Sequence, residues 1–284
     1  MIYAKNGTLL LSAYELDGDA LDKAYDINGT QIYTIEFNLK VMTYNVGGWY
    51  TGSGTNVPAD KKDAYLALQT GMIEDNDPDV LVIQEYLANF SADGTSALTL
   101  LQSLFPYVHV KTSGTYFGRA ICSKYPISDY TERTYTQESS RYFDSCAITV
   151  NGVPITFVNT HLGLTQENRD PEIVQLITYL QTQSRFIACG DYNTSITTND
   201  KTADAWVYNI KPFLDAGFHS ANCDETFYYT SSNYPDGTWN GCLDNIITSA
   251  NITIDSAEVD ETKRNDGLND RIDHMPFIAT LTIN

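Results

Sequence analysis

Long hydrophobic runs are absent from this sequence. Its apolar stretches all fall short of the ~18 residues that a membrane-spanning helix needs, although 42% of its 284 residues are hydrophobic. Residues 1–7 lead into the short patch Leu9-Leu10-Leu11 without a basic flank or a small-residue cleavage site. We therefore expect a soluble globular protein with a sizeable core and no classical secretion signal, and a cytoplasmic location is favoured over export.

Basic residues are also scarce. The chain has 17 Lys and Arg against 36 Asp and Glu, a net charge of -19. Such a surface repels nucleic acid at long range and lacks the counterion release that a basic groove would supply. High-affinity DNA binding is therefore disfavoured. A nuclease is not excluded, because divalent cations cancel charge at the site and a nuclease needs only transient contact.

Cysteine is sparse as well. The five cysteines include no C-x-x-C pair and no Cys/His cluster, which argues against a structural zinc. Cys122, Cys146 and Cys189 lie inside apolar, strand-like runs, where we expect buried reduced thiols. Cys223 and Cys242 flank a loop and could form a disulfide if the protein is exported.

Polar residues stand where the strand-like runs of this sequence end. A buried strand that stops at a carboxylate, amide or imidazole delivers that group to a sheet edge, where several edges can converge on a metal and a phosphate. The polar residues at such positions are Asn45, Glu85, His161, Asp191, Asn193, Asp244 and the pair Asp273-His274.

Two of these stretches have the most specific pattern. Gly190-Asp191-Tyr192-Asn193 resembles the G-D-x-N motif of the endonuclease/exonuclease/phosphatase superfamily, the fold of deoxyribonuclease I, and Asp273-His274-x-Pro276 resembles its S-D-H-x-P motif with Ile272 in place of Ser. The resemblance runs from about Leu39 to the C-terminus. It implies one α/β catalytic domain over 39–284, with two mixed β-sheets packed as a sandwich and helices on the outer faces.

Residues 1–38 have no motif of this family. The turn signals Asp17-Gly18 and Asn28-Gly29 predict a small N-terminal β appendage, either extra edge strands or a tether or oligomer contact. Farther along, Val150-Asn151-Gly152-Val153 predicts a tight hairpin. Helices are expected at 59–74, 95–104, 173–181 and 203–216. Hairpins together with helical connections indicate mixed sheets.

The resemblance implies a Mg²⁺ site, with Mn²⁺ as a substitute. Mg²⁺ prefers hard oxygen ligands and is usually held by one or two carboxylates and a substrate phosphate. Glu85 is the expected principal ligand, with Asn45 and Asp273 completing the sphere. Some relatives have a second acid two residues after the Asn, where this chain has Gly47.

The catalytic roles follow from the same resemblance. Hydrolysis of a phosphate ester needs an in-line water, a group that takes its proton, and donors or positive charge on the phosphoryl oxygens. We expect Asp191 to orient and deprotonate the water and Asn193 to hold the phosphate or Asp191. His274 would act as an imidazolium oriented by Asp244, and His161 would donate to the phosphate or the leaving group.

Three further residues are candidates for substrate binding: Tyr116, Arg119 and Arg141. The stretch 118–127 resembles the family's G-N-A-I-L-S-R-Y-P-I, with Arg119 in place of Asn. Arg141, just before the next strand-like run, could hold a phosphate through two nitrogens.

The sequence thus predicts a Mg²⁺-dependent phosphoesterase, first a phosphodiesterase or endonuclease that cleaves nucleic acid by direct in-line attack of water. A phosphatase or a sphingomyelinase-like phospholipase is the alternative enzyme, and a binding module without activity on the same fold is the alternative of another class. The aromatic stretch from Phe227 to Trp239 could stack on a base, touch a lipid or simply pack.

Overall fold

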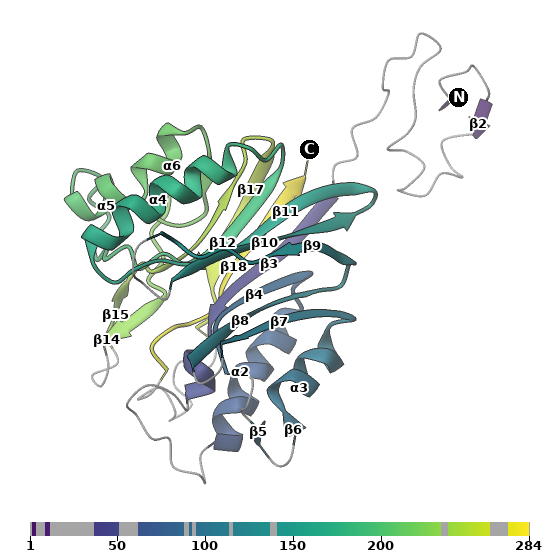
Figure 1. Cartoon of the computed structure of the whole chain (residues 1–284), viewed down its shortest axis with the longest axis horizontal. Coiled ribbons are helices and arrows are strands. Elements are labelled where there is room, and N and C mark those ends of the chain that lie inside the picture. The colour runs from purple at the N-terminus through teal and green to yellow at the C-terminus, as the bar shows by residue number, and fades with distance from the viewer. Residues whose placement is uncertain are drawn as a thin grey trace.

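The computed structural model describes residues 2–3, 9–11, 37–50, 62–87, 91–92, 95–113, 116–136, 141–233, 238–261 and 272–283. Two six-stranded sheets dominate these residues (Figure 1). The first sheet has the order β13 (His219–Ser220), β16 (Asp244–Thr248), β12 (Phe186–Asp191), β11 (Val153–His161), β10 (Tyr142–Val150) and β9 (Ile127–Thr131). The second has the order β17 (Ile252–Val259), β18 (Phe277–Ile283), β3 (Phe37–Asn45), β4 (Val80–Tyr86), β8 (Tyr116–Ser123) and β7 (Tyr107–Ser113).

Both sheets are mixed, as predicted. β11 and β12 are parallel, as are β3 and β4, and the other neighbours within the two sheets are antiparallel. The expected hairpin joins β10 to β11, with Val150 paired to Val153. Asn151 and Gly152 have φ angles of 50° and 78°, the left-handed pair that a two-residue turn of this kind requires.

Smaller elements complete the described chain. The short strand pairs are β1 (Ile2–Tyr3) with β2 (Leu9–Leu11), β5 (Ser91–Ala92) with β6 (Thr95–Ser96), and β14 (Ser231–Asn233) with β15 (Thr238–Gly241). The helices are η1 (Gly47–Tyr50), α2 (Lys62–Asn76), α3 (Ala97–Leu104), α4 (Gln166–Leu180), α5 (Asp204–Asn209) and α6 (Lys211–Asp215). No helix among the described residues has the length and hydropathy to cross a membrane.

The sheets pack face to face because their strands are apolar on both sides. In β4, Val80 and Val82 belong to the core between the sheets, whereas Leu81 and Ile83 belong to the core under α2 and α3. β12 alternates in the same way. Its odd-numbered apolar positions face the other sheet, and its even-numbered ones pack under α4 and α6. This period of two explains strands that read as continuous apolar runs.

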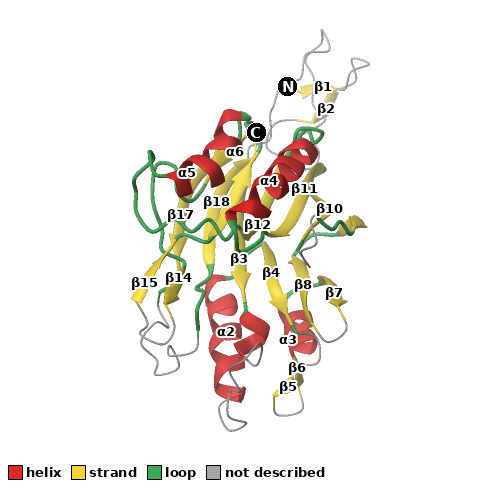
Figure 2. Ribbon diagram, turned by 60° about the vertical axis from the view of Figure 1, so that its left-hand side comes forward, coloured by secondary structure: helices red, strands yellow, loops and turns green. Residues whose placement is uncertain are grey.

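Helices cover the two outer faces. α4, α5 and α6 lie over the first sheet, and α2 and α3 lie over the second (Figures 1 and 2). The predicted fold, a sandwich of two mixed sheets with outer helices, is therefore confirmed.

Helix boundaries differ from the sequence-based ones in instructive ways. α4 starts at Gln166, seven residues before the expected 173, because Thr165 caps it and Pro171 is accommodated inside it. The expected helix at 203–216 is split into α5 and α6 at Ile210, just before Lys211-Pro212. α3 starts at Ala97, with the Ser96 side chain as its N-cap. Of the helix expected at 59–74, residues 59–61 lie outside the described residues.

The N-terminal appendage is described only in part. β1 and β2 pair antiparallel, in keeping with a β structure there. Phe37 and Asn38 already belong to β3, so the central sheet begins two residues before the expected boundary. The rest of 1–38 lies outside the described residues, and the appendage stays a prediction.

A buried amide side chain links the two sheets. Asn159 of β11 donates through Nδ2 to the carbonyl oxygens of Ile83 (2.9 Å) and Ala120 (3.3 Å) in the second sheet. Its Oδ1 accepts from Nε2 of Gln84 (3.0 Å). Ile83 and Ala120 are the last paired residues before β4 and β8 lose register toward Tyr86. The side chain of Asn159 thus holds the carbonyl oxygens at the start of this β-bulge.

We expect Asn159→Ala to lower the free energy of unfolding by about 2–4 kcal/mol, because the Gln84 amide and two carbonyl oxygens would lose a buried partner. Urea denaturation measures the change. Thr149→Ala, at an exposed position of the neighbouring strand, is the control and should change stability by less than about 0.5 kcal/mol. Equal stabilities of the two variants would contradict the bridge.

Candidate active site

Three polar side chains stand in one row across the first sheet. The parallel register of β11 and β12 pairs His161 with Asp191, and the antiparallel register of β12 and β16 pairs Asp191 with Asp244. The adjacent Gly190 makes the close approach of β11 and β12 possible, since a Cβ there would lie 2.1 Å from the carbonyl oxygen of Thr160. Close packing of the two strands therefore requires a glycine at this position of the G-D-x-N stretch.

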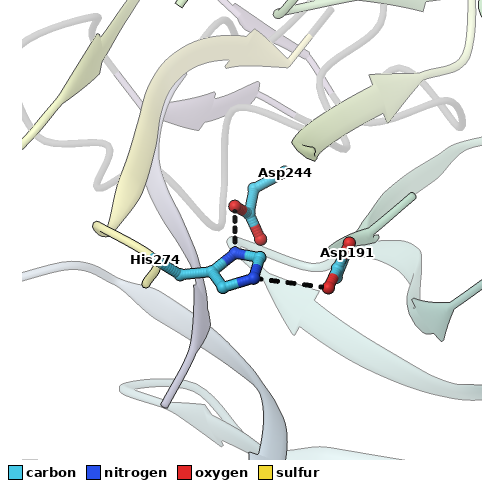
Figure 3. Close-up of side chains that lie close together, drawn as sticks. All are labelled: Asp191, Asp244 and His274. Carbon is cyan, nitrogen blue, oxygen red and sulfur yellow. Dashed lines mark hydrogen bonds and ion pairs between the residues drawn. The ribbon is translucent and has the colours of Figure 1, made fainter. Parts of the chain in front are cut away.

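His274 closes the row from the other sheet. It lies just before β18, and its Nδ1 is 2.8 Å from Oδ2 of Asp244, while its Nε2 is 3.7 Å from Oδ2 of Asp191 (Figure 3). Burial alone would lower the pKa of His274, but Asp244 and then Asp191 outweigh burial and raise this pKa well above its ordinary value of 6.5. The ring is therefore an imidazolium at neutral pH, with Nδ1–H donated to Asp244.

Asp191 is the point at which these groups meet. Its Oδ2 accepts from Nδ2 of Asn45 (3.1 Å) and lies 3.3 Å from Nε2 of His161, and its Oδ1 accepts from the backbone N–H of Asn193 (2.9 Å). Burial would raise the pKa of Asp191, but the two histidines and these donors lower it. Asp191 is thus a buried, ionised carboxylate with a fixed orientation.

His161 differs from His274 in charge. The pKa of His161 is lowered to about 3. Burial is the main cause, the nearby Arg141 guanidinium adds to it, and Asp191 opposes it. Nη1 of Arg141 contacts Nε2 of His161. Nε2 of His161 thus lies between the Arg141 guanidinium, which can only donate, and Oδ2 of the Asp191 carboxylate, which can only accept. Arg141, rather than His161, is then the cationic donor of this pair.

Glu85, Asn45 and Asp273 come from the second sheet. Glu85 occupies the β-bulge of β4 with a φ angle of 54°, an uncommon conformation for a residue with a Cβ. Burial raises the pKa of Glu85 to about 7, with Asp191 and Asp273 adding to the rise and His274 and Asn45 opposing it. Oδ1 of Asn45 accepts from the Gly47 N–H (3.0 Å). Asp273 is exposed at the rim.

Asn193 is bound mainly to the backbone around it. It has a φ angle of 47°, its N–H donates to Asp191, and its Nδ2 donates to the carbonyl oxygen of Leu162 (2.9 Å). The contact with Asp191 is therefore made by the backbone of Asn193, and both roles expected for its side chain stay predictions.

The remaining candidates are Arg119 and Tyr116. Both Nε and Nη2 of Arg119 contact the buried carboxylate of Asp144, and the guanidinium stacks 3.8 Å from the centre of the Tyr142 ring. With only 8% of its surface exposed, Arg119 serves this ion pair, which the sequence did not reveal. Tyr116 begins β8, and its side chain lies outside the described residues.

Two positioning residues were missed from the sequence. Oγ1 of Thr230 accepts from the N–H groups of Leu243 and Asp244 (3.1 and 3.0 Å), and its carbonyl oxygen accepts from the N–H of Met275 (2.8 Å). Thr230 therefore fixes the two chain segments that bring Asp244 and His274 together. No family motif marks this threonine, and it precedes a short strand that sequence periodicity does not reveal.

Arg169 of α4 is the second missed residue. Its buried guanidinium donates to the carbonyl oxygens of Gly163 and Leu164, which follow His161, and to Oγ of Ser195, which follows Asn193. A buried guanidinium needs several hydrogen-bond acceptors. Those of Arg169 come from the loop that follows His161 and the loop that follows Asn193. The expected start of α4 at 173 had left Arg169 outside the helix.

Asp191, Asp244 and His274 also have ligand atoms close enough together for a metal ion. Their hydrogen bonds argue for another use, because Nδ1 of His274 is already bonded to Asp244 and the ring is cationic. The carboxylate of Glu85 lies close enough to Asp191 and Asp273 for their charges to raise its pKa, and all three offer the hard oxygen donors that Mg²⁺ prefers.

The sequence and the fold have parallels in known proteins. The model of the "Endonuclease/Exonuclease/phosphatase family" matches residues 42–266. The catalytic domain of human Nocturnin with bound sulfate is 17% identical over 88% of this chain and 97% of that one, with a TM-score of 0.64. The 3′ phosphatase NExo from Neisseria, bound to a product DNA hairpin, is 18% identical over 85% and 98% of the two chains, with a TM-score of 0.60. No curated protein matches the sequence.

The His274–Asp244 pair leads to a prediction on pH. Asp244→Asn removes the largest contribution that raises the pKa of His274, so the ring should lose its proton at a lower pH. In a profile of kcat/KM against pH on any cleaved ester, the alkaline limb should move to lower pH in this variant. Asp170→Asn, at an exposed position of α4, is the control. An unmoved limb would mean that another group titrates there.

Proposed function

The chain belongs to the endonuclease/exonuclease/phosphatase family and is a phosphoric ester hydrolase, and from this we propose that it is a divalent-metal phosphodiesterase acting on nucleic acid. The family generally uses a divalent metal. The observation that carries the proposal is the row of His161, Asp191 and Asp244 across three strands, closed by a cationic His274. Each member has a hydrogen-bonding or ionic partner suited to its role.

The residues around Glu85 fit a divalent cation. A carboxylate whose pKa burial raises to about 7, beside the further carboxylates of Asp191 and Asp273, is in an environment short of positive charge. The donors are hard oxygens, and the oxygen of Asn45 retains a second lone pair beyond its bond to Gly47. We propose Glu85, Asn45 and Asp273 as the residues that would hold the ion, with Mg²⁺ first and Mn²⁺ as a substitute. When bound, such an ion would neutralise charge on the phosphoryl oxygens.

The side chains divide the remaining work. Asp191, ionised and fixed by Asn45 and Asn193, orients a water for in-line attack and receives its proton. His274 presents Nε2–H to the phosphoryl group and stabilises the charge that develops there, because Nδ1–H is committed to Asp244. Arg141 contributes a guanidinium that can hold a phosphate, with His161 orienting it from behind.

Two observations bear on the substrate. NExo, one of the similar structures, holds a DNA product, and the catalytic domain of Nocturnin holds a sulfate, which support an oxyanion site on this fold. The net charge of -19 opposes tight binding of a long polyanion and favours a short or transiently bound one. A phosphatase or phospholipase acting on a smaller ester is therefore the second candidate. An inactive binding module is disfavoured, because the cluster retains both its acid and its cationic partners.

A substrate panel tests the proposal. Plasmid DNA, single-stranded RNA, an inositol polyphosphate, sphingomyelin vesicles and the p-nitrophenyl mono- and diesters are each incubated with Mg²⁺, with Mn²⁺ and with a chelator. We expect metal-dependent cleavage of nucleic acid and of the diester, which His274→Ala reduces by about 10²–10⁴-fold. Release of phosphate from monoesters alone would replace the first candidate with the second.

Glu85→Gln tests the metal site without reference to a substrate. The change is nearly isosteric but removes the carboxylate charge, so the affinity for Mn²⁺ in calorimetric titration should fall by about 10²-fold, with the melting temperature little changed. Glu74→Gln, at an exposed position on α2, is the matched control. Unchanged Mn²⁺ affinity in the Glu85 variant would remove this residue from the metal site.

A further inference from the structure

Two of the five cysteines lie side by side in a small core next to the active site. Cys223 and Cys242 are both buried in the cluster that contains Ile196, Trp206 and Ile210, and their side chains contact each other. Both are free thiols in this structure. The other three cysteines lie singly in β8, β10 and β12.

The backbone of each cysteine is tied down by neighbours. The carbonyl oxygen of Cys223 accepts from Nε1 of Trp206 (2.6 Å), and its N–H donates to the carbonyl oxygen of Thr226 (2.9 Å). The N–H of Cys242 donates to the carbonyl oxygen of Ile196 (2.9 Å), and its own carbonyl accepts from Oγ1 of Thr194. Cys223 also has a φ angle of 64°, a conformation that persists in a residue with a Cβ only where packing enforces it. These bonds fix the backbone of both cysteines, and Sγ of Cys223 also donates to Oδ1 of Asn222 (3.4 Å).

The segment that these cysteines enclose includes Thr230. This residue binds the N–H groups of Leu243 and Asp244 and the N–H of Met275, as described above. A disulfide between Cys223 and Cys242 would thus close a loop that contains Thr230. Thr230 is the residue that binds both the strand of Asp244 and the segment of His274. The disulfide would lie outside the reacting groups, two residues from Asp244.

We propose that Cys223 and Cys242 form a disulfide site that staples this segment. The oxidant is a small-molecule disulfide such as oxidised glutathione. One cysteine thiolate attacks it to give a mixed disulfide and one glutathione thiolate. The second cysteine thiolate then displaces the other glutathione, so the protein loses two protons and two electrons while the oxidant becomes two thiols.

Burial determines when this exchange can occur. Burial raises the pKa of the Cys223 thiol well above its ordinary value, and Cys242 beside it adds to the rise. The folded, reduced protein should therefore react slowly, whereas a chain that is still folding exposes both thiols. Oxidation during folding is the expected route, and the finished bond should resist reductant until the protein unfolds.

The test uses the full chain and no substrate. The reduced, denatured protein is refolded with a mixture of reduced and oxidised glutathione, free thiols are alkylated in denaturant, and the intact mass and cysteine peptides are measured. We expect the product to lack two alkyl adducts relative to a fully reduced sample, with a linked peptide pair containing Cys223 and Cys242. Alkylation of all five cysteines after refolding, or a bond between other cysteines, overturns the proposal.

Thermal unfolding supplies an independent measurement. Closing a loop of this length should raise the melting temperature of the oxidised wild type by roughly 5–10 °C over the reduced protein. Cys223→Ala should abolish this difference, whereas Cys122→Ala should retain it. If the Cys223 variant does not fold, the comparison of oxidised and reduced wild type still decides, and equal melting temperatures there would refute a stapling role. None of these results depends on the proposed reaction.

Discussion

The buried ion pair between His274 and Asp244 is the interaction on which the rest of the site depends. Removing two charges from water is costly, and the cost is recovered only when the partners are close and further groups bind them. Here Nδ1 and Oδ2 are 2.8 Å apart, Asp191 lies on the other side of the ring, and Thr230 binds the backbone of Asp244, but Oδ1 of Asp244 has no hydrogen-bond partner among the described residues and burial raises the pKa of this carboxyl. The pair also joins the two sheets, since Asp244 begins β16 in one and His274 precedes β18 in the other. The contact that assembles the site therefore also holds the two sheets against each other.

Two of the site residues have irregular backbone. Glu85 and Asn193 have left-handed backbone conformations, and a bulge separates β4 from β8 at Glu85. Asp191 and Asp244 reach the edge of the sandwich from regularly paired strand ends, whereas Glu85 stands where the β4–β8 ladder is interrupted. Asn159 satisfies the carbonyl oxygens at this interruption from the opposite sheet. The strain is thus held by hydrogen bonds between the layers.

The fold and the site differ in how far the sequence predicts them. Apolar runs that stop at a polar residue place Asp191, Asp244 and Glu85 at strand ends, and the structure brings these ends together. Local patterns do not reveal partners distant in sequence, so the capture of Arg119 by Asp144 and the binding of Asp244 by Thr230 escaped prediction. The early start of α4 was missed because proline in a helix is normally disruptive, whereas Pro171 lies close enough to the N-terminus for α4 to continue. The charge states were only half predictable. Both histidines end up buried, but only His274 has a carboxylate bonded to Nδ1.

The balance of charge around Asp191 links the structure to the proposed chemistry. Among the described residues of the site, the carboxylates are Glu85, Asp191, Asp244 and Asp273 and the cations are His274 and Arg141, since burial keeps His161 neutral. This is an excess of negative charge, and burial, with Asp191 and Asp273 adding to its effect, raises the pKa of Glu85 to about 7. A divalent cation at the proposed ligands would relieve the same excess without consuming the carboxylate. It would also leave the site close to neutral, so that an incoming phosphate adds negative charge beside His274 and Arg141 and not against four bare carboxylates. Over the whole surface, the negative charge repels polyanions. At the site, the same kind of charge would bind the metal ion, and the metal ion would allow a phosphate to bind.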